Sequence, residues 1–338
     1  MTKRRRKKGR RKKRSFFKVF FIAILAFVII GVGLIYAYNT LNKVDNVTIA
    51  TDDEELEIDD SVMEHSDVMN IALFGLDEPD AKNGGRSDSI IIASLDKVHK
   101  KIKLTSIMRD TYVDIPGYGM DKINHAHSFG GPELAIKTIN RNFNMNIREF
   151  ATVDFFGLEK IINTLGGIEI DVLNDEERKY VNMGVRDMNR TDGKNGTHIT
   201  DPGLQTLTGR QAVAYSRIRK TGDGDFERTQ RQREVLEKVI HKGLDAGITK
   251  YPALLNTTLP YVTTSLSKTE ILSLGKFVLT SNINKVDKYR LPLNKYLLEQ
   301  KINGVSYIVP NTIEDNTAAL KAYIYDDIKE DMDGYIQQ

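Results

Sequence analysis

Two arginines, Arg217 and Arg219, alternate in the most highly charged segment of the chain after its N-terminal tail, residues 215–233. On an extended backbone alternate side chains point to the same side, so both guanidinium groups would face one ligand. Guanidinium groups bind phosphate oxygens through paired hydrogen bonds. The spacing therefore predicts that this pair grips one pyrophosphate.

A helix is predicted directly downstream, after a tight turn that Gly222 and Gly224 permit, with Asp225 as its N-cap. Its buried stripe begins with two polar residues and consists of Arg228, Gln232, Val235 and Val239. The N-terminus of a helix attracts anionic oxygens, so these polar groups predict an anion site. Arg233 falls outside the stripe and is expected to face solvent. The alternative is a solvated, salt-bridged helix face without function.

Three apolar runs further upstream predict strands that must position a second group of charged residues. They cover residues 70–77, 89–95 and 101–108. Short turns make the second and third runs antiparallel, and an antiparallel first run gives the order up, down, up. The end of the first run, the start of the second and the end of the third then share one edge of a sheet.

That edge is rich in carboxylates and guanidinium groups. It holds Asp77, Arg86 with Asp88, and Arg109 with Asp110. Such a composition suits a divalent metal ion beside phosphates. A row of surface salt bridges at strand ends is the alternative, because such pairs are common and contribute little.

The rest of the domain reads as helices alternating with strands. Helices are predicted at 132–143, 156–165 and about 314–325, and strands at 150–156, 168–172, 289–293 and 305–309. The pattern predicts an α/β fold, a layered α/β/α domain around a central mixed sheet. Residues 174–202 are polar and rich in Gly, Asn and Asp, and they are predicted to form a long mobile loop.

The N-terminus carries a strong membrane signal. The first 18 residues hold 12 of the 49 Lys and Arg residues, and residues 19–38 are uncharged and apolar. Twenty such residues suit one transmembrane helix, and the run is longer than a signal peptide usually has and lacks a small-x-small cleavage site. The positive flank predicts a cytoplasmic tail, residues 1–18, and a single-pass cell-membrane protein whose domain lies outside the cell.

Charge and cysteine content restrict the remaining chain. After residue 18 it holds 37 basic and 46 acidic residues, so the folded part is acidic and nucleic acid is not an expected partner. Residues 39–66 are predicted to be an acidic spacer between the membrane and a domain at 67–338. The protein has no cysteine, so an extracytoplasmic domain must be held by its core.

Several motifs together resemble the LytR-CpsA-Psr family of membrane-anchored cell-wall enzymes, and among them the wall teichoic acid transferases. They lie at Gly75–Asp77, Gly85–Ser89, Ser106–Thr111, Met120–His127, Leu165–Ile168, Leu207–Ala212, Tyr215–Arg219 and Asp225–Arg233. The resemblance implies a phosphotransferase that moves an anionic glycopolymer from a polyprenyl-pyrophosphate carrier to peptidoglycan. Its implied partners are this lipid-linked polymer, peptidoglycan and membrane lipid.

The resemblance also assigns roles to individual residues. Asp77 and Asp88 would bind Mg²⁺ or Mn²⁺, and Arg86 would bind substrate. Arg109, Arg217 and Arg219 would hold the pyrophosphate and stabilise the leaving group. The remaining assignments place Arg228 and Gln232 in the anion site, Asp225 as an orienting group, and Phe155, Phe156, Ile161, Ile162, Val235 and Val239 at a pocket for the lipid tail.

Two other functions remain open from the sequence. A hydrolase would use the same residues to cleave lipid pyrophosphates with water. A non-catalytic envelope sensor or transcription attenuator is the second alternative. The predicted cytoplasmic part is too short to contain a folded DNA-binding module, which disfavours direct DNA recognition.

Overall fold

The computed structural model describes residues 39–62, 65, 67–76, 85–221, 224–246, 250–281, 283 and 285–333. The chain forms two compact units, residues 1–43 and 44–338. The predicted basic tail and the predicted transmembrane helix at 19–38 lie outside the described residues. Within the described part, no helix combines the length and the apolar character needed to cross a membrane.

The larger unit is built around a seven-stranded sheet. In spatial order its strands are β1 (Asp45–Asn46), β10 (Thr263–Thr264), β7 (Glu149–Asp154), β2 (Val68–Leu76), β3 (Ser87–Asp96), β4 (Lys101–Ile107) and β11 (Lys285–Leu291). β3 is antiparallel to β2 and β4, as the sequence predicts, whereas β7 is parallel to β2 and β11 to β4. The end of β2, the start of β3 and the end of β4 therefore lie at one edge.

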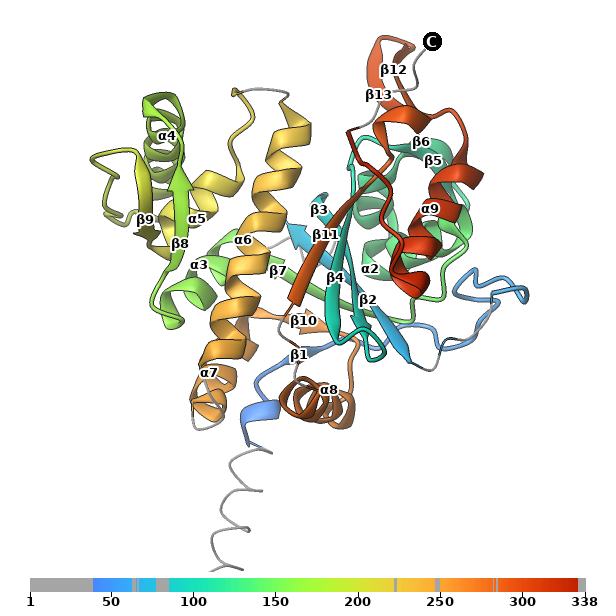
Figure 1. The fold of residues 1–338 in the computed structure, drawn as a ribbon, viewed down its shortest axis with the longest axis horizontal. Coiled ribbons are helices and arrows are strands. Elements are labelled where there is room, and N and C mark those ends of the chain that lie inside the picture. Colours follow the sequence, from blue (N-terminus) through green and yellow to red (C-terminus); the bar gives the residue numbers. More distant parts are fainter. Residues whose placement is uncertain are drawn as a thin grey trace, which may run out of the picture. The chain divides into compact units, whose positions relative to one another are not determined.

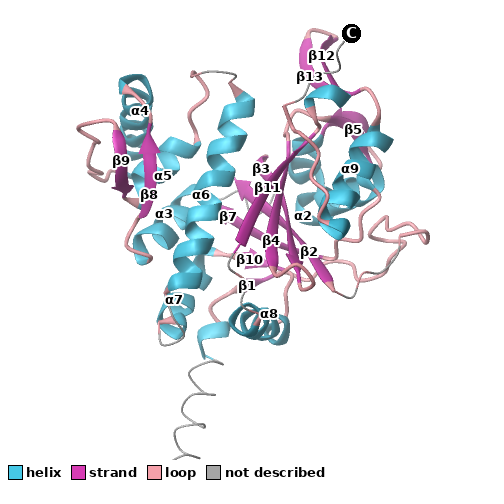
Figure 2. Cartoon of the chain, in the orientation of Figure 1, coloured by secondary structure: helices cyan, strands magenta, loops and turns pink. Residues whose placement is uncertain are grey.

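Helices cover both faces of this mixed sheet (Figure 1, Figure 2). α2 (Ile123–Phe143) and α9 (Ile313–Asp326) share a buried apolar cluster with one face. α6 (Asp225–Asp245) and α8 (Lys268–Thr280) pack on the other face. The predicted α/β/α arrangement is confirmed.

The apolar runs of the central strands follow from this layering. Side chains alternate along a strand, so Ile90 and Ile92 pack toward the α2 face while Ile91 packs toward the α6 face. A strand that is covered on both faces needs apolar residues at successive positions, not at alternate ones.

A smaller lobe with its own apolar cluster stands beside the sheet (Figure 1). Its elements are α3 (Phe155–Thr164), β8 (Ile168–Val172), α4 (Asp175–Asp192), β9 (Gly203–Leu207) and α5 (Gly209–Ser216). β8 pairs only with β9 in this described part, so the strand predicted at 168–172 is present but lies outside the central sheet. Val235 of α6 joins the same cluster, which places α6 between the lobe and the sheet.

The prediction of a mobile loop at 174–202 is wrong, because residues 175–192 form helix α4. Val181, Val185 and Met188 recur at helical spacing and are buried against the lobe. Asn174 caps the helix by accepting a hydrogen bond from the Glu177 amide at 2.9 Å. The narrow apolar stripe is set among so many polar residues that average polarity conceals it.

Two further boundaries differ from the sequence predictions. The helix predicted from residue 132 is the second half of α2, which is interrupted at Gly130 and Gly131, where Gly131 adopts a φ of 67°. Part of the predicted spacer belongs to the folded unit, because β1 pairs with β10 and the side chains of Leu56 and Ile58 are buried in the main core.

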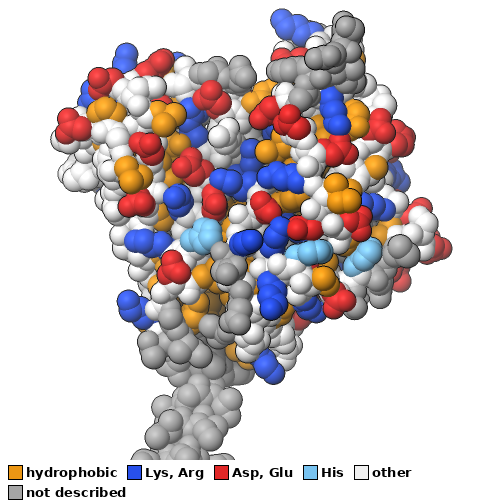
Figure 3. Space-filling view, in the orientation of Figure 1, with side chains coloured by type: hydrophobic (Ala, Val, Ile, Leu, Met, Phe, Trp, Pro, Cys, Tyr) orange, Lys and Arg blue, Asp and Glu red, His pale blue; other side chains and the backbone are white. Residues whose placement is uncertain are grey.

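The C-terminal predictions hold for β11, for α9 and for β13 (Val305–Pro310), which pairs with β12 (Leu297–Ile302). A second hairpin, β5 (Tyr112–Ile115) and β6 (Gly119–Lys122), leads into α2. The shorter elements are α7 (Tyr251–Thr258) and the 3-10 turns η2 (Leu259–Tyr261) and η3 (Asn294–Tyr296). On the face viewed in Figure 3, basic and acidic side chains are interspersed.

Candidate active site

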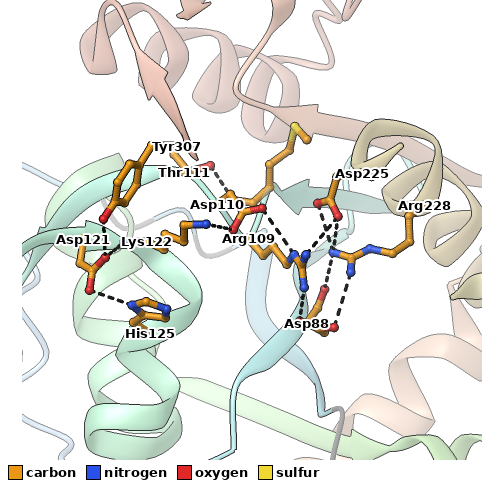
Figure 4. A network of polar contacts seen from close by, with 11 residues as sticks. Asp88, Arg109, Asp110, Thr111, Asp121, Lys122, His125, Asp225, Arg228 and Tyr307 are labelled. Atoms are coloured by element: carbon orange, nitrogen blue, oxygen red, sulfur yellow. Dashed lines mark hydrogen bonds and ion pairs between the residues drawn. The ribbon is translucent and has the colours of Figure 1, made fainter. Parts of the chain in front are cut away.

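The side chain of Asp88, near the start of β3, is surrounded by three arginines, of which Figure 4 shows Arg109 and Arg228. Arg109 donates through Nη1 at 2.6 Å and Arg219 through Nη2 at 2.7 Å. Arg228 approaches through Nη1 at 3.5 Å. The Asp88 side chain is 8% exposed, so these bonds hold a nearly buried carboxylate at the predicted edge of the sheet.

Two more aspartates complete the cluster. Asp225 lies 2.9 Å from Nη2 of Arg228 and 3.5 Å from Nη2 of Arg109. Asp110 lies 3.6 Å from Nε of Arg109 and forms an ion pair with Nζ of Lys122 at 2.8 Å. Arg109 therefore contacts three carboxylates with one planar group, which a lysine could not do.

The fold brings these residues together from three places. Asp88 and Arg109 sit at neighbouring strand ends of the sheet, where β3 begins and β4 has just ended. Arg228 and Asp225 lie in the first turn of α6, and Arg219 lies in the segment between α5 and α6. The site thus forms where the sheet, the smaller lobe and the N-terminus of α6 meet.

Electrostatics keep this cluster ionised. Burial raises the pKa of Asp88, but the charges of Arg109 and Arg228 outweigh it and hold that pKa below its ordinary value. Burial is also the largest influence on Arg228, and it lowers the pKa of that guanidinium to about 10 while Asp225 opposes the shift. Both groups are therefore charged at neutral pH.

A polar cavity of about 830 Å³ opens at this cluster. It is lined by Gly85, Arg86, Asp88, Arg109, Asp110, Lys122, Asn124, His125, Ser128, Arg219 and Val305. A second cavity of about 360 Å³ shares Asp88 and Arg219 with it and also contains Arg217, Arg228 and Gln232. The cluster thus faces solvent-filled space on two sides.

An apolar cavity of about 210 Å³ adjoins the second cavity through Phe155 and Gln232. Its other walls include Leu73, Leu158, Ile161, Val235, Leu236 and Val239. Four of the six residues expected at a lipid-tail pocket line it. Phe156 does not, and Ile162 is packed instead in the core of the smaller lobe.

Most of the predicted site residues come together, but not always as expected. Arg217 is the C-cap of α5 and has helical φ and ψ. The prediction that Arg217 and Arg219 lie on one extended stretch is therefore wrong. Its guanidinium lies 4.2 Å from the ring centre of Phe155. Both arginines still line one cavity because the chain bends after the helix. Asp77 lies outside the described residues.

Two predictions for α6 need correction. Gly224, with a φ of 61°, occupies the N-cap position, and Asp225 is the first helical residue. Arg233 is buried, not exposed, because it faces away from the Asp88 cluster and toward β11. The apolar spacing in the sequence identified one buried side of α6, whereas in the structure other segments pack against this helix on more than one side.

The sequence did not single out the polar chain that supports Asp110 (Figure 4). Beyond Lys122, Asp121 accepts from Nδ1 of His125 at 2.7 Å and from the Tyr307 hydroxyl at 3.4 Å. Asp121 and His125 are four residues apart where β6 runs into α2, and that i, i+4 spacing was the available signal.

A second group of side chains among the described residues has the composition of a metal site. Asp96, His99 and Asp327 bring ligand atoms within 4.8 Å of one another. Nζ of Lys103 lies 2.7 Å from Asp96 and 3.2 Å from Asp327, so a lysine already occupies the position of a cation. This cluster lies at the opposite end of β3 and is an ion-pair network.

Comparisons with known proteins agree with the geometry. Residues 32–322 match the LytR_cpsA_psr family. The chain is 34% identical over 264 residues to the polyisoprenyl-teichoic acid–peptidoglycan teichoic acid transferase TagU of Bacillus anthracis, covering 75% of this chain and 80% of TagU. It is 31% identical to the regulatory protein MsrR of Staphylococcus aureus, covering 77% of this chain and 75% of MsrR.

A solved structure shows the same fold. TagT bound to LI-WTA superimposes with a TM-score of 0.63 at 26% identity, and the alignment covers 83% of this chain and 99% of TagT.

Proposed function

Because the chain belongs to the LytR_cpsA_psr family, we propose that it transfers an anionic glycopolymer, wall teichoic acid, from a polyprenyl-pyrophosphate carrier to peptidoglycan. The name of TagU and the TagT complex with a wall teichoic acid intermediate support this substrate class. The relative MsrR is named a regulatory protein, and the geometry of the site favours the transferase over a regulator.

The main observation that supports this function is that an arginine-lined cavity adjoins an apolar cavity. Asp88, Arg217, Arg219 and Arg228 line the polar side, and Phe155 and Gln232 form the border. A ligand that fits both must have a compact anionic group joined directly to an apolar chain. A polyprenyl pyrophosphate has this construction, whereas a soluble nucleotide or a free sugar phosphate does not.

The reaction breaks one bond and forms one. An acceptor hydroxyl oxygen attacks the phosphorus that carries the polymer, and the P–O bond to the second phosphate breaks. Polyprenyl phosphate leaves with the electron pair, and the hydroxyl proton passes to a base or to water. The transition state spreads negative charge over phosphoryl oxygens, so positioned positive groups supply most of the rate enhancement.

The arginines differ in how firmly they are positioned. Arg109 and Arg228 are held by Asp88 and Asp225, so their geometry exists before substrate arrives. Arg86, Arg217 and Arg219 have exposed side chains and would close on the pyrophosphate from the cavity walls. Asp225 contacts both fixed arginines, so it would orient them or the incoming hydroxyl.

A divalent ion remains a proposal, with Asp77 and Asp88 as ligands. The donor chemistry fits, since Mg²⁺ prefers carboxylate oxygens and the exposed Arg219 could yield its place on Asp88. When bound, Mg²⁺ or Mn²⁺ would neutralise charge on phosphoryl oxygens. Loss of transfer in excess chelator, restored by Mg²⁺ and not by Ca²⁺, would support it. Full transfer activity in excess chelator would show that the reaction does not need a metal ion.

Location follows from the N-terminal charge pattern. Twelve basic residues before a 20-residue apolar run would keep the N-terminus in the cytoplasm and the domain outside, anchored to the cell membrane. The lipid substrate would then come from the outer leaflet. Protease added to wall-stripped cells should release the domain, and complete protection would contradict this orientation.

The direct test uses the full chain in lipid nanodiscs with labelled polyprenyl-pyrophosphate-linked polymer. Label should appear on peptidoglycan only when peptidoglycan is added, and polyprenyl phosphate should be released in equal amount. Equal release without acceptor would identify a lipid-pyrophosphate hydrolase. No turnover with either would favour a non-catalytic sensor.

A further inference from the structure

A large cavity lies on the other side of α6, away from the Asp88 cluster. It has a volume of about 720 Å³ and lies between α6, β11, the start of β12 and the C-terminal segment near Asp333. Phe226, Gln230 and Arg233 present one face of α6 to it, at spacings of four and three residues. Lys288 and Arg290 line the opposite wall from β11. Figure 3 shows basic and acidic side chains side by side on the face that carries these elements.

The arginine of α6 in this cavity has an unusual environment. The side chain of Arg233 is buried, with the residue 5% exposed, and its Nη1 finds no hydrogen-bond partner among the described residues. A buried charge is costly unless it is paired. Burial, followed by the charge of Arg290, lowers the pKa of Arg233 to about 10, so it is still charged at neutral pH.

The neighbouring arginine is fixed by the fold. Arg290 donates through Nη2 to the Asn294 side chain and to the Met332 carbonyl, both at 2.8 Å, and its guanidinium lies 4.6 Å from the ring centre of Phe226. Two buried guanidinium groups therefore line the same cavity, Arg233 from α6 and Arg290 from β11. Like charges held this close favour an anion between them or beside them.

The acidic residues of the cavity leave Nη1 of Arg233 without a hydrogen bond, although the charge of Asp333 attracts this guanidinium. Glu227 is bound by Arg231 of the same helix at 2.7 Å. Asp333 lies 3.6 Å from Arg290, but its side chain is 84% exposed, so solvent screens the pair and an incoming anion can replace it. Glu299, at the rim, is exposed.

A route joins this cavity to the Asp88 cluster. A third cavity, of about 320 Å³, shares Phe226 and Glu299 with the large one. Its lining also includes Asp110 and Asp225, which contact Arg109. A chain molecule whose reacting phosphate lies at Arg109 could thus continue along α6 to Arg233.

We propose that the Arg233 cavity binds a backbone phosphodiester of the anionic polymer, one or more repeats from the reacting phosphate. The inference rests on the proposed function for the identity of the polymer. The site itself is defined by a buried arginine whose Nη1 has no hydrogen-bond partner among the described residues, by a second buried arginine that lines the same cavity and by open space for a sugar phosphate unit. It would select donors that carry a phosphate-containing chain over short donors.

Binding is tested on the full chain with an oligomer of glycerol phosphate, with inorganic pyrophosphate and with a neutral dextran of similar length. Arg233→Met should weaken oligomer binding roughly tenfold to a hundredfold, as expected for a lost charge-assisted hydrogen bond. Its pyrophosphate affinity should be unchanged because that probe reports the Asp88 cluster. Dextran should bind neither protein.

Stability separates binding from structural support. Because burial of the Arg233 charge is costly and its Nη1 has no hydrogen bond among the described residues, Arg233→Met should keep or raise the melting temperature. Arg290→Met should lower it, since the hydrogen bonds to Asn294 and Met332 are lost. Arg178→Met is the matched control, because Arg178 forms an ion pair with the exposed Asp175 at the surface. A fall in melting temperature for Arg233→Met with unchanged oligomer binding would overturn the proposal.

Transfer assays separate this inference from the function on which it rests. With wild type, donors bearing a phosphate-containing chain and donors bearing only the linkage sugars should both react. Arg233→Met should raise KM for the long donor and leave the short donor unaffected. Equal effects on both donors, or none, would overturn the cavity proposal. Failure of wild type with both donors would overturn the proposed function instead, and the oligomer titration would still decide whether the cavity binds phosphodiesters.

Discussion

The two ends of strand β3 each hold a buried aspartate among positive side chains, but the two clusters differ in access. At the start of the strand, Asp88 meets Arg109, Arg219 and Arg228. At its end, Asp96 meets Lys103 and His99. The same chemistry of charge pairing therefore occurs twice on one strand.

Solvent exposure separates the two clusters. The side chains of Asp96 and Lys103 are both 0% exposed, and Nζ of Lys103 also donates to the Ile324 carbonyl at 2.9 Å. That lysine thus ties β4 to α9. By contrast, Arg219 is 46% exposed and lines two cavities with Asp88.

The choice of cation also differs. A lysine provides one compact charge for a closed pair, whereas an arginine offers five donors and can hold a carboxylate while leaving other N–H groups for a ligand. The comparison teaches that a buried ion pair indicates a site only when some of its donors remain open. We therefore expect Asp96 to serve stability and Asp88 to serve activity.

The largest effect is expected at the closed end. Lys103→Met leaves Asp96 without its main partner in a buried position, so the free energy of unfolding should fall by about 3–5 kcal/mol. Urea unfolding followed by circular dichroism measures it. Transfer activity per folded molecule should be unchanged. A variant that is as stable as wild type but inactive would reverse the roles that we assign to the two clusters.

Arg109→Lys should produce the next largest effect, on activity. The lysine keeps the charge but cannot reach Asp88, Asp110 and Asp225 together, as Arg109 does. We expect kcat to fall roughly 10²-fold to 10³-fold, the usual result of losing one positioned donor. Steady-state transfer assays check this. Arg178→Lys, at the surface, is the control, and equal activity in both variants would show that only bulk charge matters.

The sequence predicted the edge of the sheet well because strand order follows from short turns. Asp88 and Arg109 meet as the up, down, up arrangement requires. It also predicted that Arg228 lies on a buried stripe of its helix, and the side chain is 2% exposed. These inferences need only local periodicity and connection lengths.

The parts that failed depend on contacts between segments distant in the sequence. Arg233 is buried because β11, some 50 residues later, packs beside α6. α4 was read as a loop because its stability comes from a narrow stripe packed on α5, not from propensity. Periodicity shows that a residue can be buried, but only tertiary packing shows on how many sides a helix is covered.

Acidification should act on both ends of β3 in the same direction. The pKa values of Asp88 and Asp96 are both lowered in the folded protein. The charges of Arg109 and Arg228 outweigh burial at Asp88, whereas hydrogen bonds from the His99 amide and from Lys103 outweigh it at Asp96. Each therefore contributes stability above the unfolded pKa of about 4, and that contribution is lost as pH falls through the folded pKa. In Asp88→Asn the stability difference from wild type should shrink between pH 7 and pH 3. A constant difference, measured by urea unfolding, would mean that ionisation of Asp88 does not stabilise the fold.

The smallest effect is expected for Arg219→Lys, which tests the open side of the Asp88 cluster. Arg219 makes a single 2.7 Å bond to Asp88 from a side chain that is nearly half exposed, so lysine can replace part of its interaction and solvent screens the rest. We expect the transfer rate to fall about tenfold, with no loss of thermal stability. The loss of one positioning contact reduces the rate less at the exposed Arg219 than at the more buried Arg109. Raising the salt concentration from about 50 mM to about 500 mM should reduce the difference between variant and wild type, whereas it should leave the Arg109→Lys defect unchanged. If salt affects both variants equally, the two arginines act at the same depth, and the distinction between a fixed inner arginine and a closing outer one fails.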